Sequence, residues 1–260
     1  MTSEISEISE ISEIGTDGTD GTDGTDGFHA TLHSLRVWDS PLPGFDTGAA
    51  PAEPLPLFRE WFVHAARAGQ LEPHTMSLAT VDGAGRPDVR TLMLHDADER
   101  GWHFASHVTS AKGVQLAAQP RAALGFYWPT VARQIRIRGR VTACGPEESR
   151  ADLAVRSRGA LAAALTGRQS EVLESAEDLV RASERAWERA GAEPDAPAPT
   201  WTRYVLDADE VEFFQGDPTR RHTRLRYRRT TGPDADTDAD TDTDADADAG
   251  SSWVRELLWP

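Results

Sequence analysis

Cysteine and long apolar stretches are nearly absent from this sequence of 260 residues. Cys144 is the only cysteine, which excludes an intrachain disulfide and a metal site built from several cysteines. No apolar run approaches the roughly 20 residues of a membrane-spanning helix, and the N-terminus lacks the basic and apolar segments of a secretory signal. We therefore expect a cytoplasmic protein without membrane contact. The spacing of its eight histidines predicts no metal.

Lysine is as scarce as cysteine, because 26 arginines accompany a single lysine, Lys112. Several nucleotide and hydrolase motifs are missing as well. The sequence holds no Gly-rich phosphate loop, no Gly-x-Gly-x-x-Gly after a predicted strand and no Gly-x-Ser-x-Gly. These absences exclude the common nucleotide-binding loops and the nucleophile turn of α/β-hydrolases. They also make the one retained lysine a candidate functional residue.

Acidic residues are concentrated in three repetitive tracts, at residues 3–14, 15–27 and 234–249. These tracts contain sixteen acidic residues, which account for the whole net charge of −16. The rest of the chain is electrically balanced. Because nucleic-acid phosphates are held largely by net positive surfaces, we expect no nucleic-acid partner.

The same composition divides the chain into segments. Repetitive acidic tracts lack the apolar side chains that a folded core needs. We therefore predict a disordered tail at residues 1–27 and a disordered insertion at residues 233–250. Residues 28–54 form a Pro-rich approach segment, and residues 55–260 form one domain that carries the insertion.

The domain pattern is mainly β with flanking helices. Phe58, Trp61, Phe62 and Ala65 have the spacing of an amphipathic helix that ends at Gly69. Further helices are expected at residues 110–118, 147–156 and 170–190. Period-two alternation predicts strands at residues 76–81, 89–95, 101–106, 122–128, 134–143, 203–207, 211–215, 221–228 and 253–257. Tight turns between consecutive strands favour antiparallel pairing, and many short strands favour a barrel.

Three polar sets are candidates for anion binding. Ser110 and Lys112 begin a predicted helix, where free backbone N–H groups and the helix dipole favour a phosphate. Arg220, His222 and Arg224 alternate onto one face of a strand, as suits a phosphate or carboxylate. A third set follows the strand at residues 134–143 as Gln134, Arg136, Arg138 and Arg140. Each set is also what a solvated surface contains, and these residues alone leave both interpretations open.

Several motifs in the same order resemble the pyridoxine/pyridoxamine 5′-phosphate oxidase family. The resemblance covers the chain from about Leu55 to its end, apart from the acidic insertion. It is carried by Arg90-Thr-Leu-Met-Leu-His95, Gly101-Trp-His-Phe-Ala-Ser106, Ser110-Ala-Lys112-Gly113, residues 120–129, Arg133-Gln134-Ile-Arg-Ile-Arg-Gly139, Arg168-Gln169-Ser170, Val211-Glu-Phe-Phe-Gln-Gly216, Arg220-Arg-His222-Thr-Arg224 and the closing Leu258-Trp259-Pro260.

The resemblance implies a homodimeric antiparallel split β-barrel with FMN at the subunit interface. It implies FMN contacts from Arg90, Thr91, Leu92, Ala105, Ser106, Lys112, Gln134, Gln169, Ser170, Phe214 and Arg224. It places the substrate at His95, Asp152, Arg156, Arg220 and His222, of which Arg220 and His222 are the expected catalytic pair. The implied reaction passes hydride from a pyridoxine/pyridoxamine 5′-phosphate-like substrate to the flavin. Dioxygen then reoxidises the flavin and gives pyridoxal 5′-phosphate and hydrogen peroxide.

The chain departs from the family pattern where the substrate phosphate is expected. His95 stands in place of a lysine, Asp152 in place of a tyrosine and Ala160 in place of a serine. A carboxylate near a phosphate dianion replaces attraction with repulsion. Ala105, Ser106, Ala111 and Phe214 also depart from the family at the flavin. Either Asp152 points away from the substrate, or the substrate is not a phosphate ester.

These departures leave other functions open. One is the same fold and FMN acting on an unphosphorylated ring substrate, as in the related phenazine-biosynthesis flavin oxidases. Another is a non-catalytic flavin-binding or storage module with an acidic tail, which turnover would exclude. A deazaflavin-dependent reductase on the same barrel is more distant, because the Gln134 and Arg224 motifs resemble the FMN branch.

Overall fold

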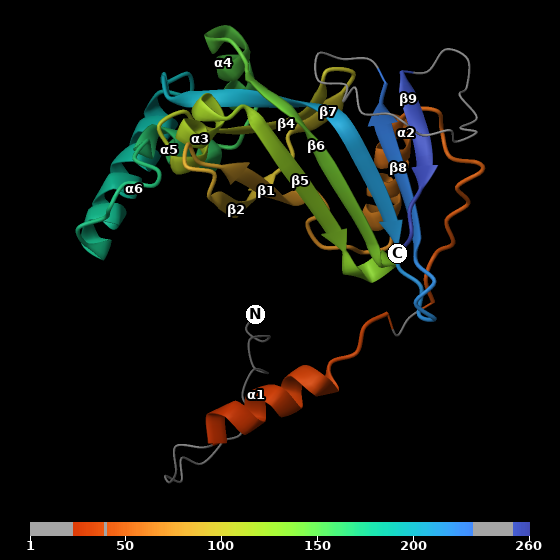
Figure 1. The fold of residues 1–260 in the computed structure, drawn as a ribbon. Coiled ribbons are helices and arrows are strands. Elements are labelled where there is room, and N and C mark those ends of the chain that lie inside the picture. The colour runs from red at the N-terminus through yellow and green to blue at the C-terminus, as the bar shows by residue number, and fades with distance from the viewer. Residues whose placement is uncertain (1–22, 39–40, 231–251) are drawn as a thin grey trace, which may run out of the picture.

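The computed structural model describes residues 23–38, 41–230 and 252–260, and an antiparallel sheet forms the body of this part of the chain (Figure 1). Its nine strands are β1 Thr75–Val81, β2 Pro87–Met93, β3 Asp96–Asp98, β4 Gly101–His107, β5 Arg121–Trp128, β6 Arg133–Ala143, β7 Trp201–Gln215, β8 Thr223–Arg229 and β9 Trp253–Leu257. They follow the order β2-β1-β5-β6-β7-β4-β3, and β8 pairs with β7 and β9. The sheet curls and splits, which confirms the predicted mainly β, split-barrel class.

The split occurs along β7, which has 15 residues. The first half of β7 pairs with β4, where Thr202 lies opposite Ser106. The second half pairs with β8, where Phe214 lies opposite Arg224. The prediction of two separate strands at residues 203–207 and 211–215 is therefore wrong. The polar residues between them stay in β7, and the pairing with β6 merely shifts register between Arg138 and Gly139.

The helices are α1 Asp23–Ser34, α2 Pro54–Arg67, α3 Ala111–Ala118, α4 Pro146–Ala154, α5 Arg158–Thr166 and α6 Ala176–Ala192, with a short 3-10 turn at Pro129–Val131. The predicted helix at residues 170–190 begins six residues later, because the Ser175 side chain accepts the Asp178 N–H and caps α6 there. Helix α5 was not predicted. Its boundaries carry ordinary signals, a Ser157 cap and a left-handed Gly167.

The predicted tail and insertion fall largely outside the described part of the chain, namely at residues 1–22 and 231–251. Residues 23–27, predicted as the end of the disordered tail, belong to helix α1 instead. Repetitive composition therefore did not locate the start of this helix. Among the described residues, none of the helices has the length and apolar character needed to cross a membrane.

The core lies between α2 and the concave face of the sheet. Phe58 and Trp61 from α2 are almost fully buried, and their rings contact Phe126 and Phe213 at centroid distances of 5.3 and 5.2 Å. Aromatic contacts of this kind add to the stabilisation from apolar burial. The predicted stripe of α2 therefore covers the barrel, and the cavities described below lie around its rim.

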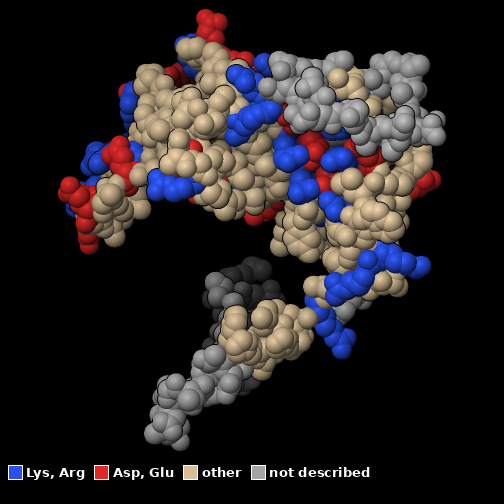
Figure 2. Space-filling model, in the orientation of Figure 1, with Lys and Arg blue, Asp and Glu red and all other residues tan. Residues whose placement is uncertain are grey.

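The outer face of β6, β7 and β8 alternates charges of opposite sign. Arg136 pairs with Glu212, and Arg138 pairs with Glu210 at 2.7 Å. Figure 2 shows positive and negative side chains intermingled over this part of the sheet. The arginine stripe of β6 is therefore largely compensated across the strands, which explains how so many arginines share one face without net positive charge.

Candidate cofactor and substrate site

The start of α3 forms a cradle around the single lysine. Ser110 caps the helix, because its Oγ accepts the Gly113 N–H at 3.3 Å and donates to the His107 carbonyl at 2.7 Å. A side chain on Gly113 would collide with the His107 and Val108 carbonyls, so only glycine fits there. Lys112 is 6% exposed, and its Nζ donates to Ser106 Oγ at 3.0 Å and to Gln169 Oε1 at 2.9 Å.

This buried ammonium has only neutral oxygen partners. Among the described residues, no carboxylate lies within ion-pair distance of Lys112 Nζ, and a buried charge is normally paired. Burial, together with the Arg90 guanidinium, lowers the pKa of Lys112. A phosphate at this helix start would supply the missing negative charge. The donor set therefore fits the phosphate end of FMN.

The loop after α5 reaches the same cradle. Gly167 ends α5 in a left-handed conformation, and Gln169 and Ser170 follow. Ser170 has a φ of 75°, and its Oγ accepts the Ala111 N–H at 3.2 Å. The structure thus brings the predicted Gln169 and Ser170, from the loop after α5, to Ser106 and Lys112 at the end of β4 and the start of α3.

Arg90 is oriented by other protein groups. Its guanidinium donates to Thr80 Oγ1 at 2.6 Å, to Gln115 Oε1 at 3.0 Å and to Asp88 Oδ2 at 2.5 Å. Because Asp88 already compensates its charge, Arg90 contributes less free positive potential than Lys112. The sequence prediction for this residue stays a prediction.

A cavity of about 550 Å³ opens beside the cradle. Six predicted site residues line it: Thr91, Leu92, His95, Ala105, Ser106 and Gln169. Its remaining wall is mainly apolar and includes Trp201, Val172, Leu173 and Leu179. Trp201 and His107 were missed by sequence reasoning. The two residues are paired across β4 and β7, and the sequence analysis did not predict that these two strands are neighbours.

The remaining predicted cofactor residues lie toward the other end of β7. Gln134 on β6 pairs with Phe214 on β7, which in turn pairs with Arg224 on β8. Gln134 lines a smaller cavity of about 360 Å³, and Thr91 lines both cavities. Arg224 Nε donates to Glu212 Oε1 at 2.7 Å and Nη1 donates to the Trp259 carbonyl at 2.8 Å.

Glu212 organises this second group. The side chain is 2% exposed and is held by Arg224 and Arg136. Burial alone would raise the pKa of Glu212, but the two arginines outweigh it and lower that pKa. Sequence reasoning missed this residue, because only the β6–β7 register of the structure places Glu212 directly opposite Arg136.

The expected catalytic pair belongs to the same end of the molecule. His222 Nδ1 accepts the Asp217 N–H at 3.0 Å, so the neutral ring carries its proton on Nε2. The ring contacts Phe214 and Trp38, each at a centroid distance of 5.0 Å. Arg220 has a φ of 68° and its guanidinium lies 5.5 Å from the Trp38 ring centroid. Trp38 was not predicted as a site residue.

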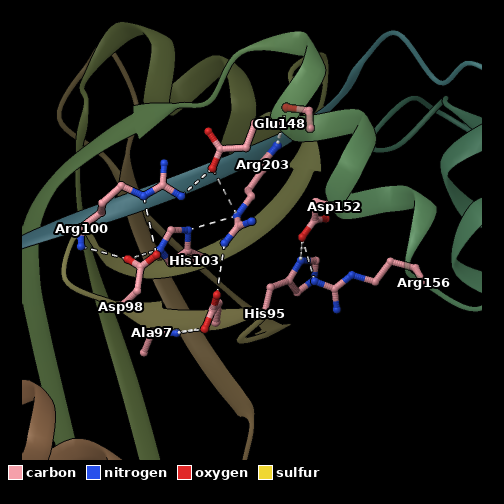
Figure 3. Close-up of polar contacts among 11 residues, drawn as sticks. His95, Ala97, Asp98, Arg100, His103, Glu148, Asp152, Arg156 and Arg203 are labelled. Atoms are coloured by element: carbon pink, nitrogen blue, oxygen red, sulfur yellow. Dashed lines mark hydrogen bonds and ion pairs between the residues drawn. The ribbon is translucent and has the colours of Figure 1, made fainter.

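The other expected substrate residues form a separate cluster near the large cavity (Figure 3). Asp152 Oδ1 accepts from Arg156 Nη2 at 2.8 Å and lies 3.2 Å from His95 Nδ1. Burial alone would raise the pKa of Asp152, but His95 and Arg156 outweigh it and hold that pKa well below its ordinary value. The lowered pKa keeps the Asp152 carboxylate ionised, but of these three residues only His95 lines the cavity.

The predicted residues therefore occupy two ends of one strand. Ser106 pairs with Thr202 and Arg224 pairs with Phe214, twelve residues further along β7. At roughly 3.3 Å per residue, this separation is about 40 Å along the strand. Within one chain, Ser106, Gln169 and Ser170 gather around Lys112 (the Lys112 group), and Gln134 and Phe214 are neighbours of Arg224 across the strands (the Arg224 group). The two groups do not meet each other within that chain. Neither of the two cavities is lined by residues of both groups.

Comparison with known proteins agrees with the resemblance. Residues 62–215 match the profile described as pyridoxamine 5′-phosphate oxidase. Residues 201–260 match the profile described as the pyridoxine 5′-phosphate oxidase C-terminal dimerisation region. The chain belongs to the pyridoxamine 5′-phosphate oxidase family. The predicted membership is thus confirmed, and the protein is an oxidoreductase.

Named relatives and solved structures support this assignment. A pyridoxine/pyridoxamine 5′-phosphate oxidase from Pseudomonas fluorescens is 40% identical over 222 residues, which cover 84% of this chain and 93% of the relative. One from Azotobacter vinelandii is 43% identical, with coverage of 73% and 89%. The structure of PhzG from Burkholderia lata, in complex with tetrahydrophenazine-1-carboxylic acid, is 27% identical with a TM-score of 0.72. It covers 85% of this chain and all of that one.

A more distant structure shares the fold. An FMN-binding protein from Nostoc punctiforme, related to pyridoxamine 5′-phosphate oxidase, is 22% identical with a TM-score of 0.58. The match covers 78% of this chain and 97% of the chain of that protein. Family membership, together with the buried Lys112 cradle, supports the predicted cofactor FMN.

Proposed function

We propose that this protein is an FMN-dependent oxidase. It oxidises the amine- or hydroxyl-bearing carbon of a pyridoxine/pyridoxamine 5′-phosphate-like ring substrate and gives the corresponding aldehyde. With the phosphorylated vitamin as substrate, the products are pyridoxal 5′-phosphate and hydrogen peroxide, and the amine form also consumes water and releases ammonia. When bound, FMN accepts the hydride and returns the electrons to dioxygen. The observation that carries the proposal is the buried Lys112, which has no anionic partner among the described residues.

The site is proposed to form between two copies of the chain. Ser106 and Arg224 pair with residues that are twelve positions apart on β7, and neither cavity is lined by residues of both groups, which favours a cofactor site to which a second copy supplies one group. The family's C-terminal dimerisation region, matched at residues 201–260, includes β7, β8 and β9 and favours a homodimer. In a twofold arrangement each copy gives both groups, which produces two equivalent sites.

Within each site the chain's own residues have distinct tasks. Lys112 holds the cofactor phosphate at the start of α3, while Gln134 and Arg224 orient the ring. His222 presents its Nε2–H as a donor, because the Asp217 N–H occupies Nδ1. Arg220 adds a cation beside it. These two residues hold the substrate against the cofactor, so that proximity and orientation lower the barrier to hydride transfer.

A second candidate is the same chemistry on a phenazine-type ring without a phosphate ester. The likeness to PhzG, with a TM-score of 0.72, supports it. The Asp152 carboxylate near the large cavity supports it as well. The two candidates use the same cofactor residues and differ in the group that the far end of the substrate carries.

Anaerobic mixing tests the proposed reaction. FMN-loaded protein is mixed without oxygen with pyridoxamine 5′-phosphate, with pyridoxamine and with tetrahydrophenazine-1-carboxylic acid, each in excess. Bleaching of the flavin absorption that returns on admitting air supports the oxidase, and the substrate that bleaches fastest selects the candidate. A flavin that stays oxidised with all three would overturn the proposal.

A further inference from the structure

Five polar side chains form a closed circle of contacts around His103 (Figure 3). Asp98 lies 2.7 Å from His103 Nε2 and pairs with Arg100 at 3.6 Å. Glu148 accepts from Arg100 at 2.6 Å and pairs with Arg203 at 3.9 Å. Arg203 Nε in turn donates to His103 Nδ1 at 3.1 Å. We call these five residues the His103 circle, and it joins β3, β4, β7 and α4.

The contacts fix where His103 carries its proton. A guanidinium N–H only donates, so His103 Nδ1 accepts from Arg203 and carries no hydrogen. The proton of the neutral imidazole is therefore on Nε2, which donates to Asp98 Oδ1. Burial alone would raise the pKa of Asp98, but the hydrogen bonds from His103 and from the Arg100 N–H outweigh it and lower that pKa. His103 is fully buried and sits between one donor and one ionised acceptor.

The charged groups around the imidazole come from every element that packs against it. They are Asp96 and Asp98 from β3, Arg100 from the turn after β3, Glu148 from α4 and Arg203 from β7. The Cys144 thiol beside Glu148 adds no charge, because burial raises its pKa to about 11. Three carboxylates and two guanidiniums thus leave one excess negative charge around a neutral imidazole.

A second proton on His103 would break the circle at one defined contact. Nδ1 would change from an acceptor into a donor and would then face the Arg203 Nε–H, with a positive charge on both sides. The contact with Asp98 would persist, because Nε2 donates in either state. Protonation therefore separates β7 from β4 and β3 at this point and leaves the other contacts in place.

The His103 circle holds the two elements between which His95 lies. His95 directly precedes β3, and its backbone N–H donates to the His103 carbonyl at 2.7 Å. Its imidazole Nδ1 lies 3.2 Å from Asp152 Oδ1, and Asp152 is one turn beyond Glu148 on α4. His95 lines the large cavity. By tying β3 to α4, the circle fixes the position of His95 in the cavity wall.

We propose that His103 is a positioning residue for the substrate. Its neutral form closes the circle and holds His95 in place, whereas an added proton opens the circle and weakens substrate binding without releasing FMN. The inference rests on the proposed function and adds pH-dependent control of the same site. FMN is expected to stay bound, because the printed contacts of Lys112 and Arg224 involve no member of the circle.

Anaerobic flavin reduction across the range in which histidine titrates, about pH 5 to 8, tests the inference. The substrate is pyridoxamine 5′-phosphate, or tetrahydrophenazine-1-carboxylic acid if only that compound reduces the flavin. The comparison protein is His103→Gln, which keeps an acceptor and a donor but cannot gain a proton. The half-saturating substrate concentration of wild type, divided by that of the variant, is expected to rise roughly fivefold or more toward the acid end, as for one lost hydrogen bond. This ratio cancels the titration of the substrate and of other residues.

A matched pair of α4 variants tests the circle without changing the buried histidine. Glu148→Gln removes the α4 charge from the circle and is expected to raise the half-saturating concentration roughly threefold or more near pH 8. Glu147→Gln removes the neighbouring exposed carboxylate of the same helix turn, which is outside the circle, and is expected to match wild type. FMN affinity should stay within about a factor of two in all three variants, since none touches the Lys112 cradle.

Three results would overturn the inference. One is a ratio of wild type to His103→Gln that does not change with pH. Another is an equal effect of the two α4 substitutions. The third is a loss of FMN affinity in His103→Gln as large as its loss of substrate affinity, because the circle would then only support the fold.

Hydrogen exchange of α4, residues 146–154, separates this inference from the proposed function. If the oxidase is wrong but the circle is real, neither compound reduces the flavin. Exchange in α4, corrected for the intrinsic effect of pH, still accelerates toward acid pH in wild type and not in His103→Gln. If only the inference is wrong, the flavin is reduced and α4 exchange has the same pH dependence in both proteins.

Discussion

Replacement of Lys112 by methionine is expected to change cofactor affinity and apoprotein stability in opposite directions. The variant keeps the length and apolar stem of the side chain but removes the ammonium that contacts Ser106 and Gln169. A hydrogen bond to a charged group contributes about 1.5–3 kcal/mol. At about 1.4 kcal/mol per factor of ten, FMN is expected to bind roughly 10- to 150-fold more weakly. Quenching of FMN fluorescence during titration of apoprotein measures this directly.

The apoprotein of the same variant is expected to be more stable. A buried ammonium without a carboxylate partner costs desolvation energy, and replacing buried charge with apolar volume often stabilises by about 1–4 kcal/mol. Each kcal/mol corresponds to a rise of roughly 2–4 °C in melting temperature for a domain of this size. Calorimetry of FMN-free wild type and variant gives the comparison.

The sign of the pH dependence provides a further check. The folded-state pKa of Lys112 lies below its ordinary value of 10.5. The unfolded chain therefore binds more protons within the window between the two values, and wild-type apoprotein gains stability as pH rises through it. The stability gap between wild type and Lys112→Met should shrink toward pH 10.5.

An exposed ion pair serves as the control for this variant. Arg189 pairs with Glu193 on the surface of α6, so Arg189→Met removes one positive charge without touching the cradle. It should leave FMN affinity within a factor of two. If Lys112→Met also retained wild-type FMN affinity, the assignment of the cradle to the cofactor phosphate would be refuted.

Three further variants test other parts of the structure. Asp152→Asn should lower the free energy of unfolding at pH 7. The difference from wild type should shrink as pH falls below 3.8, the ordinary pKa, toward the lowered pKa of the folded state. Equal differences in urea unfolding at pH 7 and pH 3 would contradict this. Glu212→Gln should cost about 1–3 kcal/mol in urea unfolding and reduce FMN retention, because Arg224 loses its partner; unchanged retention would count against the second group. Trp38→Ala should slow flavin reduction about tenfold while FMN stays bound, since misplacing a positioned group lowers rate; Trp187→Ala, which loses a similar contact with Arg158, is the control and should not.

Much of the fold follows from local pattern, and the misses have physical causes. The alternation at residues 134–143 correctly gave the buried face of β6, where Ile135 and Ile137 are fully buried. The prediction divided β7 because its polar middle resembles a turn, yet long-range pairing with β6 keeps it extended. Helix α5 is rich in alanine, and only its end signals at Ser157 and Gly167 distinguished it from a loop.

The candidate site divides in the same way. Lys112 stood out from the sequence because it is the only lysine and begins a helix. The Asp152 cluster required the three-dimensional structure, because residues 95 and 152 are distant in sequence and their meeting depends on how α4 docks. The placement of the predicted residues at two ends of β7 also emerges only from strand pairing. Local spacing carries no information about that separation.

The most direct test of the account asks whether one site is built from two chains. Lys112→Met and Arg224→Met each damage a different group and are expected to lose FMN when prepared alone. When the two are unfolded and refolded together, half of the dimers are hybrids, and each hybrid has one site with both groups intact. FMN retention and flavin reduction should then recover to about one quarter of the wild-type level. No recovery in the mixture, or full retention by either variant alone, would contradict the shared site.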